Sequence, residues 1–320
     1  MTIGEDELPN RLGIFAAALM LSANALPAAA QTAQMGQADQ IVVTAQRTGI
    51  PVWRVTSPTT TLVLIGSIEG VAKATQWDAA SLTETLRQAD RVMFPNTISV
   101  SGSPFSMIGY LVKWRKQATL PKGQTLAQLL TPSQFQRLAA LQKRGLLKPG
   151  FERKHPFHLA LTLHGIARGR GGNGPSANEY VRKAVKKHKI KTVPIASIKA
   201  KGVASDFFAT PPQAYLPCLM DSVTLVEAGS GAVKARSDAW AQRRVRAVLA
   251  SPAERVIESC MPPAFASAKP RNLPGQVRNL LDQKPITVAV IDLASLAKSG
   301  GVLDSLEKAG FDVRGPRWKG

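Results

Sequence analysis

The residues best suited to chemistry follow a short apolar run near the start of the chain. Leu62 to Ile65 are too few for a helix and precede Gly66, which predicts a buried strand that runs into a tight turn. The turn carries Glu69. A polar side chain at the end of a buried strand lies at the sheet edge where open α/β folds bind ligands. Glu69 is therefore a candidate metal ligand or general base; the alternative is a loop carboxylate that faces water.

Two further candidates follow an apolar run near the other end of the chain. Ile286 to Asp292 predicts a buried strand that ends on a carboxylate, and Ser295 follows it closely. Asp292 would partner Glu69 across the sheet, and one carboxyl of such a pair needs a raised pKa to act as an acid. A serine hydrolase is excluded for Ser67 and Ser295, because neither lies in a Gly-x-Ser-x-Gly elbow with a matching histidine.

Three of the four histidines lie close together in the sequence, at His155, His158 and His164. Pro156 predicts the start of a helix that carries the last two. These two differ by about 600° of helical rotation and so point about 120° apart. A regular helix therefore does not direct both rings at one metal ion.

Several framework segments follow a known pattern: Trp53-Arg54-Val55, Leu62 to Ile68, Trp77, Ala89 to Val92 and Gly301 to Val313. Together they resemble the TraB/PrgY/GumN family. In that family the turn reads Gly-Thr/Ser-Ile-His, and its histidine helps to build a metal-dependent hydrolase site. The resemblance implies that residues 51–314 form one domain of this family, with residues 315–320 as a tail.

The resemblance also implies that the family's site residues are replaced. Glu69 stands at the position of the first signature histidine, Ser295 at that of the second, and Pro95 at that of a glutamate. One carboxylate and one hydroxyl hold a divalent ion feebly, so we expect no metal cofactor, with Glu69 as the remaining candidate ligand. If the site has instead been rearranged around Glu69, the protein is a metal-dependent hydrolase and needs a divalent metal.

The expected fold class is α/β, with two related strand–turn–helix halves that share one sheet. In the first half, residues 53–55 and 62–65 pair as a hairpin, Asp78 caps a helix over residues 79–89, and Arg91 to Phe94 returns as a strand. A large, mostly helical insertion spans about residues 97–285. Within it we expect helices over residues 215–228 and 235–250.

The start of the chain has the features of an export signal. Leu12 begins an apolar stretch too short to span a bilayer, and Ala28-Ala29-Ala30 gives a small-residue cleavage pattern. We therefore predict a signal peptide over residues 1–30 and a periplasmic or secreted protein; an uncleaved signal would make it membrane-anchored. Residues 31–50 form a leader in which Ile41 to Arg47 resembles the TonB-contacting box of outer-membrane receptors, so an extended segment there could bind TonB by strand addition.

Cysteine content and charge narrow the remaining possibilities. In an oxidising compartment Cys218 and Cys260 are expected to form a disulfide, the alternative being two buried thiols. The net charge of +20 favours anionic envelope components as partners. Nucleic acid is not expected, because the basic stretch Arg182 to Lys201 lacks interleaved aromatic residues.

Three functions remain open on the sequence. The protein is a non-catalytic exported binding protein, a hydrolase with a rearranged site, or an adaptor that engages TonB or the anionic envelope.

Overall fold

The computed structural model describes residues 36, 39–94, 97–99, 109, 112–169, 173–194, 197–229, 231–261, 272–282 and 286–319. The chain divides into two units, residues 1–40 and residues 41–320, and the fold is that of the second unit. The predicted signal peptide and Pro95 lie outside the described residues.

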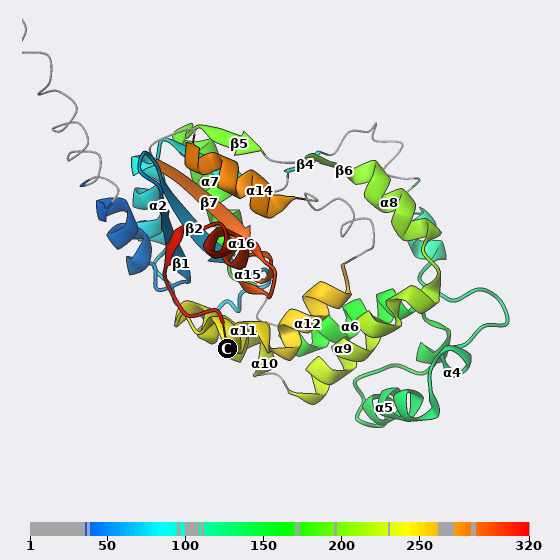
Figure 1. Ribbon diagram of the computed structural model, residues 1–320. Coiled ribbons are helices and arrows are strands. Elements are labelled where there is room, and N and C mark those ends of the chain that lie inside the picture. The colour runs from blue at the N-terminus through cyan, green and yellow to red at the C-terminus, as the bar shows by residue number, and fades with distance from the viewer. Residues whose placement is uncertain are drawn as a thin grey trace, which may run out of the picture. The chain divides into compact units, whose positions relative to one another are not determined.

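A six-stranded sheet with the order β5-β3-β7-β2-β1-β8 forms the centre of the fold (Figure 1). Its strands are β1 (Val52–Thr56), β2 (Thr61–Ser67), β3 (Arg91–Phe94), β5 (Thr192–Pro194), β7 (Ile286–Asp292) and β8 (Asp312–Arg314). The four strands β5, β3, β7 and β2 run parallel, whereas β1 is antiparallel to both of its neighbours. Strands buried on both faces read as continuous apolar runs, as β2 and β7 do.

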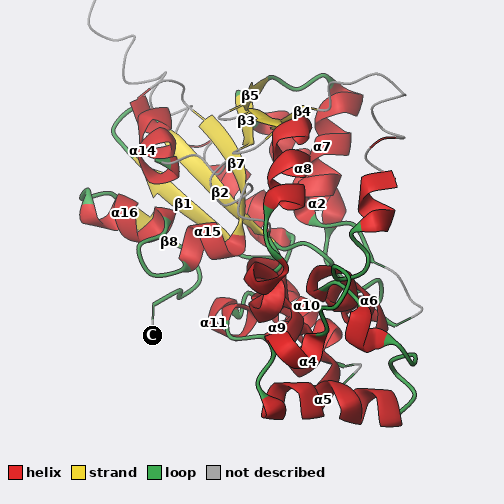
Figure 2. Ribbon diagram, turned by 90° about the vertical axis from the view of Figure 1, so that its right-hand side faces the viewer, coloured by secondary structure: helices red, strands yellow, loops and turns green. Residues whose placement is uncertain are grey.

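Helices cover both faces of the sheet (Figure 2). On one side lie α2 (Ala79–Gln88) and α7 (Ala177–His188), and on the other α14 (Leu273–Arg278) and α16 (Val302–Lys308). Asp78 caps α2 by accepting a hydrogen bond from the Ser81 amide at 3.0 Å. The predicted α/β class, the hairpin of β1 and β2, and one sheet shared by both halves are confirmed.

Strand β2 continues beyond the predicted turn at Gly66. Its parallel pairing with β7 runs on through Gly66↔Ile291 and Ser67↔Asp292. Gly66 is needed for close packing and not for a turn, because a Cβ there would lie 2.6 Å from the Leu293 side chain. The turn therefore begins after Ser67.

The segment between β3 and β7 is mostly helical and has a hydrophobic core that includes Leu138, Leu163, Leu219 and Val223. Its remaining helices are α4 (Leu126–Leu129), α5 (Pro132–Lys143), α6 (Pro156–Arg168), α8 (Ala200–Ala209), α9 (Leu216–Glu227), α10 (Ala232–Ala241), α11 (Val245–Leu249) and α12 (Pro252–Ser259). The insertion also contributes β5 to the main sheet, and β4 (Thr97–Ser99) pairs with β6 (Ser197–Lys199) in a second, two-stranded sheet.

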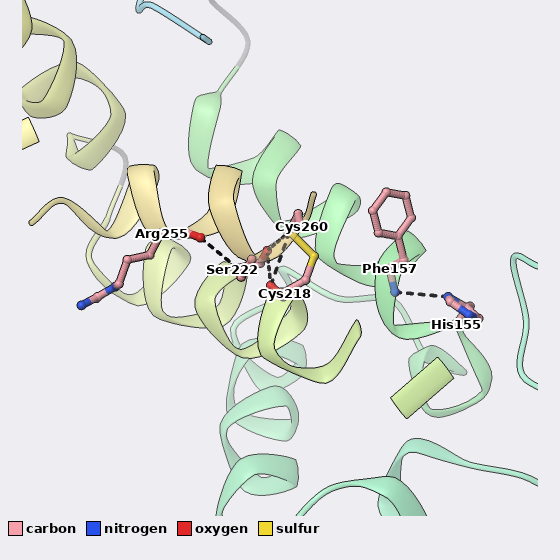
Figure 3. The surroundings of a disulfide bond; sticks show 7 residues. His155, Phe157, Cys218, Ser222, Arg255 and Cys260 are labelled. Atoms are coloured by element: carbon pink, nitrogen blue, oxygen red, sulfur yellow. Dashed lines mark hydrogen bonds between the residues drawn. A yellow bond between two sulfur atoms is a disulfide. The ribbon is translucent and has the colours of Figure 1, made fainter. Parts of the chain in front are cut away.

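A disulfide ties two helices of the insertion together (Figure 3). Cys218 in α9 and Cys260, the residue that follows α12, are bonded at an S–S distance of 2.04 Å. Beside the bond, the Ser222 hydroxyl donates to the Cys218 carbonyl at 2.8 Å. The cysteine pairing expected from the sequence is thus the one that the structure shows.

Two sequence predictions of local structure were wrong. Residues 41–47 are helical and not an extended TonB-box-like strand, and Ile41 and Ala45 are fully buried. Residues four apart share one helix face, so burial of that face outweighs the local β preference of the Ile-Val-Val run. The helix predicted over residues 235–250 breaks into α10 and α11, because Arg243 adopts a positive φ of 60°.

The end of the chain packs against the domain. The Trp53 indole donates to the Pro316 carbonyl at 3.0 Å, and the Trp318 indole donates to Asp304 at 2.9 Å. Among the described residues, no helix has both the length and the apolar character needed to cross a membrane.

Candidate functional site

The carboxyl ends of β2 and β7 lie side by side and bring the predicted site residues to one edge of the sheet (Figure 2). Ser67 ends β2 directly opposite Asp292, which ends β7. Glu69 follows Ser67 in the turn, and its side chain is exposed at this edge. Parallel strands present ligand sites at their carboxyl ends. We call this group of residues the Glu69 edge.

The first turn of α7 closes one side of the Glu69 edge. Ser176 caps α7 by accepting a hydrogen bond from the Glu179 amide at 3.2 Å, and the Glu179 carboxylate accepts from the Ser176 amide at 3.1 Å. The Asn178 amide donates to the Ser67 hydroxyl at 3.1 Å. These contacts join α7 to the end of β2, and the α7 N-terminus favours negative charge nearby.

The pKa of Glu69 is raised, mainly because the surrounding protein desolvates its carboxylate. The carboxylates of Glu179 and Asp292 raise it further by repulsion, while hydrogen bonds from Asn178 and Ser176 act in the opposite direction. Glu69 therefore holds its proton to a higher pH than an ordinary glutamate.

A buried ion pair contacts the backbone of the Glu69 turn. Arg236 of α10 and Glu254 of α12 have side chains only 1% and 4% exposed, and Arg236 Nε lies 2.7 Å from Glu254 Oε2. The same guanidinium donates from Nη1 to the Glu69 carbonyl at 2.8 Å. Burial raises the pKa of Glu254, as does Asp292, and Arg236 opposes the rise. The pair thus connects the insertion to the backbone of the candidate residue.

Trp240 fixes the end of β2 from the same helix. Its indole donates to the Gly66 carbonyl at 2.8 Å, and its ring meets Trp77 edge-on at a centroid distance of 5.4 Å. Trp77 in turn meets Tyr180 of α7 at 5.8 Å. The sequence did not assign a role to Arg236, Glu254 or Trp240 at this edge. The bonds of Arg236 and Trp240 to this edge join positions more than 160 residues apart, and no local periodicity signals them.

Asp292 and Ser295 are engaged with each other at the start of α15 (Leu293–Ala297). Asp292 caps this helix by accepting from the Ser295 amide at 3.0 Å and from the Ser295 hydroxyl at 3.2 Å. Asp292 is close enough to Glu69 to affect its pKa, so both candidates share one edge. The Ser295 hydroxyl, however, already donates to a carboxylate.

His155 and His158 meet edge-on at a ring-centroid distance of 6.0 Å, whereas His164 lies near Arg168 and Arg236. His155 is buried at the start of α6, where its Nδ1 accepts from the Phe157 amide at 3.2 Å, and burial lowers its pKa to about 4. His158 packs on Trp114 at a ring distance of 4.3 Å. His164 lies near enough to Arg168 and Arg236 for their charges to add to burial, and its pKa is also lowered to about 4.

A family model of the TraB/PrgY/gumN family matches residues 51–315 of the chain. The chain belongs to this family. Searches of curated proteins and of solved structures gave no match. The matched range contains both strands of the Glu69 edge and the whole insertion between them.

The residues at the Glu69 edge do not fit the metal centre that the TraB/PrgY/GumN resemblance implies. That centre requires two histidines, and the resemblance implies that Glu69 and Ser295 stand in their place. The Ser295 hydroxyl donates a hydrogen bond to Asp292, and Asp292 caps α15. Of the two candidate carboxylates, Glu69 is therefore the one that does not cap a helix. In the described part of the chain, no three His, Cys, Asp or Glu side chains are grouped so as to hold an ion.

Proposed function

We propose that this TraB/PrgY/GumN family member is an exported binding protein that has lost the family's metal-dependent hydrolase chemistry. One observation carries the proposal: Ser295, at the second signature position, is a helix-capping partner of Asp292. A zinc-type hydrolase site needs nitrogen, sulfur or carboxylate ligands and an open position for water. A hydroxyl that donates to a neighbouring carboxylate supplies none of these.

The organisation of the Glu69 edge supports a binding role. The turn is held by Arg236 at its backbone, by Trp240 at the end of β2 and by Asn178 at Ser67. Such a preorganised edge lowers the entropy lost on binding. Glu69, which is exposed there, can accept a hydrogen bond when ionised or donate one when protonated.

Export is supported by two features that are independent of the Glu69 edge. Residues 12–30 have the apolar stretch and the small-residue ending of a secretory signal. Cys218 and Cys260 are bonded, and disulfides persist mainly in oxidising compartments.

Elemental analysis of the protein, purified without chelators or affinity histidines, tests the proposal. We expect far less than one equivalent of Mn, Co or Zn in the wild type, in Glu69→Ala and in the control Glu307→Ala. Near-stoichiometric metal that disappears only in Glu69→Ala would overturn the proposal and establish the alternative, a metal-dependent hydrolase rearranged around Glu69.

A second candidate function is an interaction with anionic envelope components. A groove of about 480 Å³ between α2 and α7 is lined by four basic side chains, Arg87, Lys183, Lys187 and His188, and by one carboxylate, Glu84. Excess positive charge in a groove attracts anionic partners. If this function is correct, Lys183→Glu/Lys187→Glu will abolish salt-sensitive binding to phosphatidylglycerol vesicles, whereas the control Lys122→Glu/Lys143→Glu, two exposed lysines outside the groove, will retain it. Equal binding by both double variants would exclude the groove.

A further inference from the structure

A separate pocket of about 490 Å³ lies in the helical insertion, between α6 and the segment around residues 146–154. Its walls are mainly apolar and include Leu146, Leu147, Phe151, Leu159 and Ile166. Small-molecule pockets have volumes of roughly 300–1,000 Å³ and mostly apolar linings with a few polar groups. None of the lining residues belongs to the Glu69 edge.

The titratable side chains that line this pocket are all basic. Of the described residues that line it, Lys148, Lys154 and His158 are titratable, and there is no carboxylate among them. Lys154 lies close enough to His158 to lower the imidazole pKa, an effect that adds to the larger effect of burial. The pocket therefore combines an apolar wall with one positively charged end.

His158 has an unused hydrogen-bonding atom at that end. Its Nε2 is buried and has no hydrogen-bond partner among the described residues. Its ring is held against Trp114 at a centroid distance of 4.3 Å. A buried polar atom without a partner is unfavourable, because it has lost its bond to water and gained none, so a ligand that completes this bond is favoured at this position.

The basic end is held in place by backbone contacts. Thr119 and Lys154 form an isolated antiparallel bridge. On either side of it, the Leu120 amide donates to the Arg153 carbonyl at 2.8 Å, and the His155 amide donates to the Ala118 carbonyl at 3.1 Å. These contacts fix the backbone of Lys154, and His158 is fixed within α6, so the pocket exists before a ligand binds.

We propose that this pocket binds a free single-chain amphiphile with a carboxylate head group. The acyl chain lies along the wall of Leu147, Phe151 and Ile166, and the carboxylate pairs with Lys154 and accepts a hydrogen bond from His158 Nε2. The charge of the pocket selects an anion, and its apolar lining selects a chain. Its volume suits one acyl chain and is too small for the two chains of a phospholipid.

Titration calorimetry of the full chain with dodecanoate tests the proposal. We expect saturable one-site binding, which tightens by up to about fourfold for each methylene added between octanoate and dodecanoate. Thr162→Trp, which fills the pocket from α6, will weaken dodecanoate binding by tenfold or more. The matched control Leu161→Trp changes the neighbouring residue, which is 41% exposed and does not line the pocket, and will bind within twofold of the wild type.

The head group is tested with a second pair of variants and a neutral ligand. Lys154→Gln will weaken dodecanoate binding about fivefold to tenfold, whereas Lys143→Gln, outside the pocket, will not. Dodecanol will bind to the wild type and to Lys154→Gln with equal, weak affinity. Absence of saturable dodecanoate binding, equal effects of the two tryptophan variants, or binding only to anionic phospholipid vesicles would overturn the proposal.

Discussion

The ends of β2 and β7 are neighbours in one sheet, but their polar residues have different surroundings. At the end of β7, Asp292 caps the helix that follows it and is bonded by Ser295, so local contacts satisfy both side chains. At the end of β2, Glu69 has a raised pKa, and its turn is held by residues from α10 and α7 that are distant in sequence. The difference shows that local contacts fix the polar residues of the β7 end, and it supports our proposal that the β2 end is the one that binds a ligand.

The largest expected effect comes from the ion pair beneath the Glu69 turn. Arg236→Met leaves Glu254 as an unpaired buried charge and should destabilise the protein by about 3–5 kcal/mol. The double variant Arg236→Met/Glu254→Leu should recover much of this loss, because both charges are removed. Urea unfolding measures the free energy of unfolding of the single and the double variant. An equal loss in the single and double variants would show that the Arg236 bond to the Glu69 carbonyl matters more than the charge pair.

Removal of the disulfide should have the next largest effect. Cys218→Ser/Cys260→Ser should lose about 2–4 kcal/mol, because the bond restricts the unfolded chain. The site at the sheet edge is built from other contacts, so the pKa of Glu69, followed by NMR titration, should not change. A shift in that pKa would show that the disulfide also positions the Glu69 edge.

The two strand ends can be compared directly by removing one carboxylate at a time. Asp292→Ala loses a helix cap and should cost about 1 kcal/mol. Glu69→Gln removes a carboxylate whose charge is disfavoured by partial desolvation at the sheet edge and by two neighbouring carboxylates, so it should leave the stability unchanged or slightly increased. Thermal unfolding at neutral pH measures both variants. If Glu69→Gln lowers the stability as much as Asp292→Ala does, Glu69 stabilises the fold to the same extent as Asp292.

The smallest expected effect is a dependence of stability on pH. The folded-state pKa of Glu69 is raised above its ordinary value of 4.5, so the folded state binds the proton more tightly than the unfolded state. This contribution is fully present below pH 4.5 and is lost as the pH rises through the folded-state pKa. The wild type should therefore lose stability relative to Glu69→Gln over that range. A difference that is constant with pH would contradict the raised pKa.

The sequence predicted those parts of the fold that have strong local signals. Asp78 marks the start of α2, and the apolar runs of β2 and β7 are strands that share a sheet. It also placed Glu69 and Asp292 at one edge, because both follow buried strands of an α/β fold.

The features that the sequence did not predict depend mainly on contacts between residues that are distant in the sequence. The Arg236 bond to the Glu69 carbonyl and the Trp240 bond to the Gly66 carbonyl arise only when the insertion folds against the sheet. The helix at residues 41–47 forms because tertiary burial of one face overrides a local β preference, and the break at Arg243 reflects a backbone conformation that has no sequence signature.

The most direct test of the lost hydrolase chemistry is to restore the family's residues and to measure metal affinity. In Glu69→His/Pro95→Glu/Ser295→His, the dissociation constant for Zn²⁺ or Mn²⁺ should be more than about 100-fold lower than in the wild type. Loss of a residue that only supports a metal ligand changes metal affinity by roughly 10–100-fold, and the restored ligands themselves should contribute more. The wild type should bind either ion only weakly. Tight, stoichiometric binding by the wild type, with no gain in the restored variant, would contradict the proposal that these replacements removed the metal site.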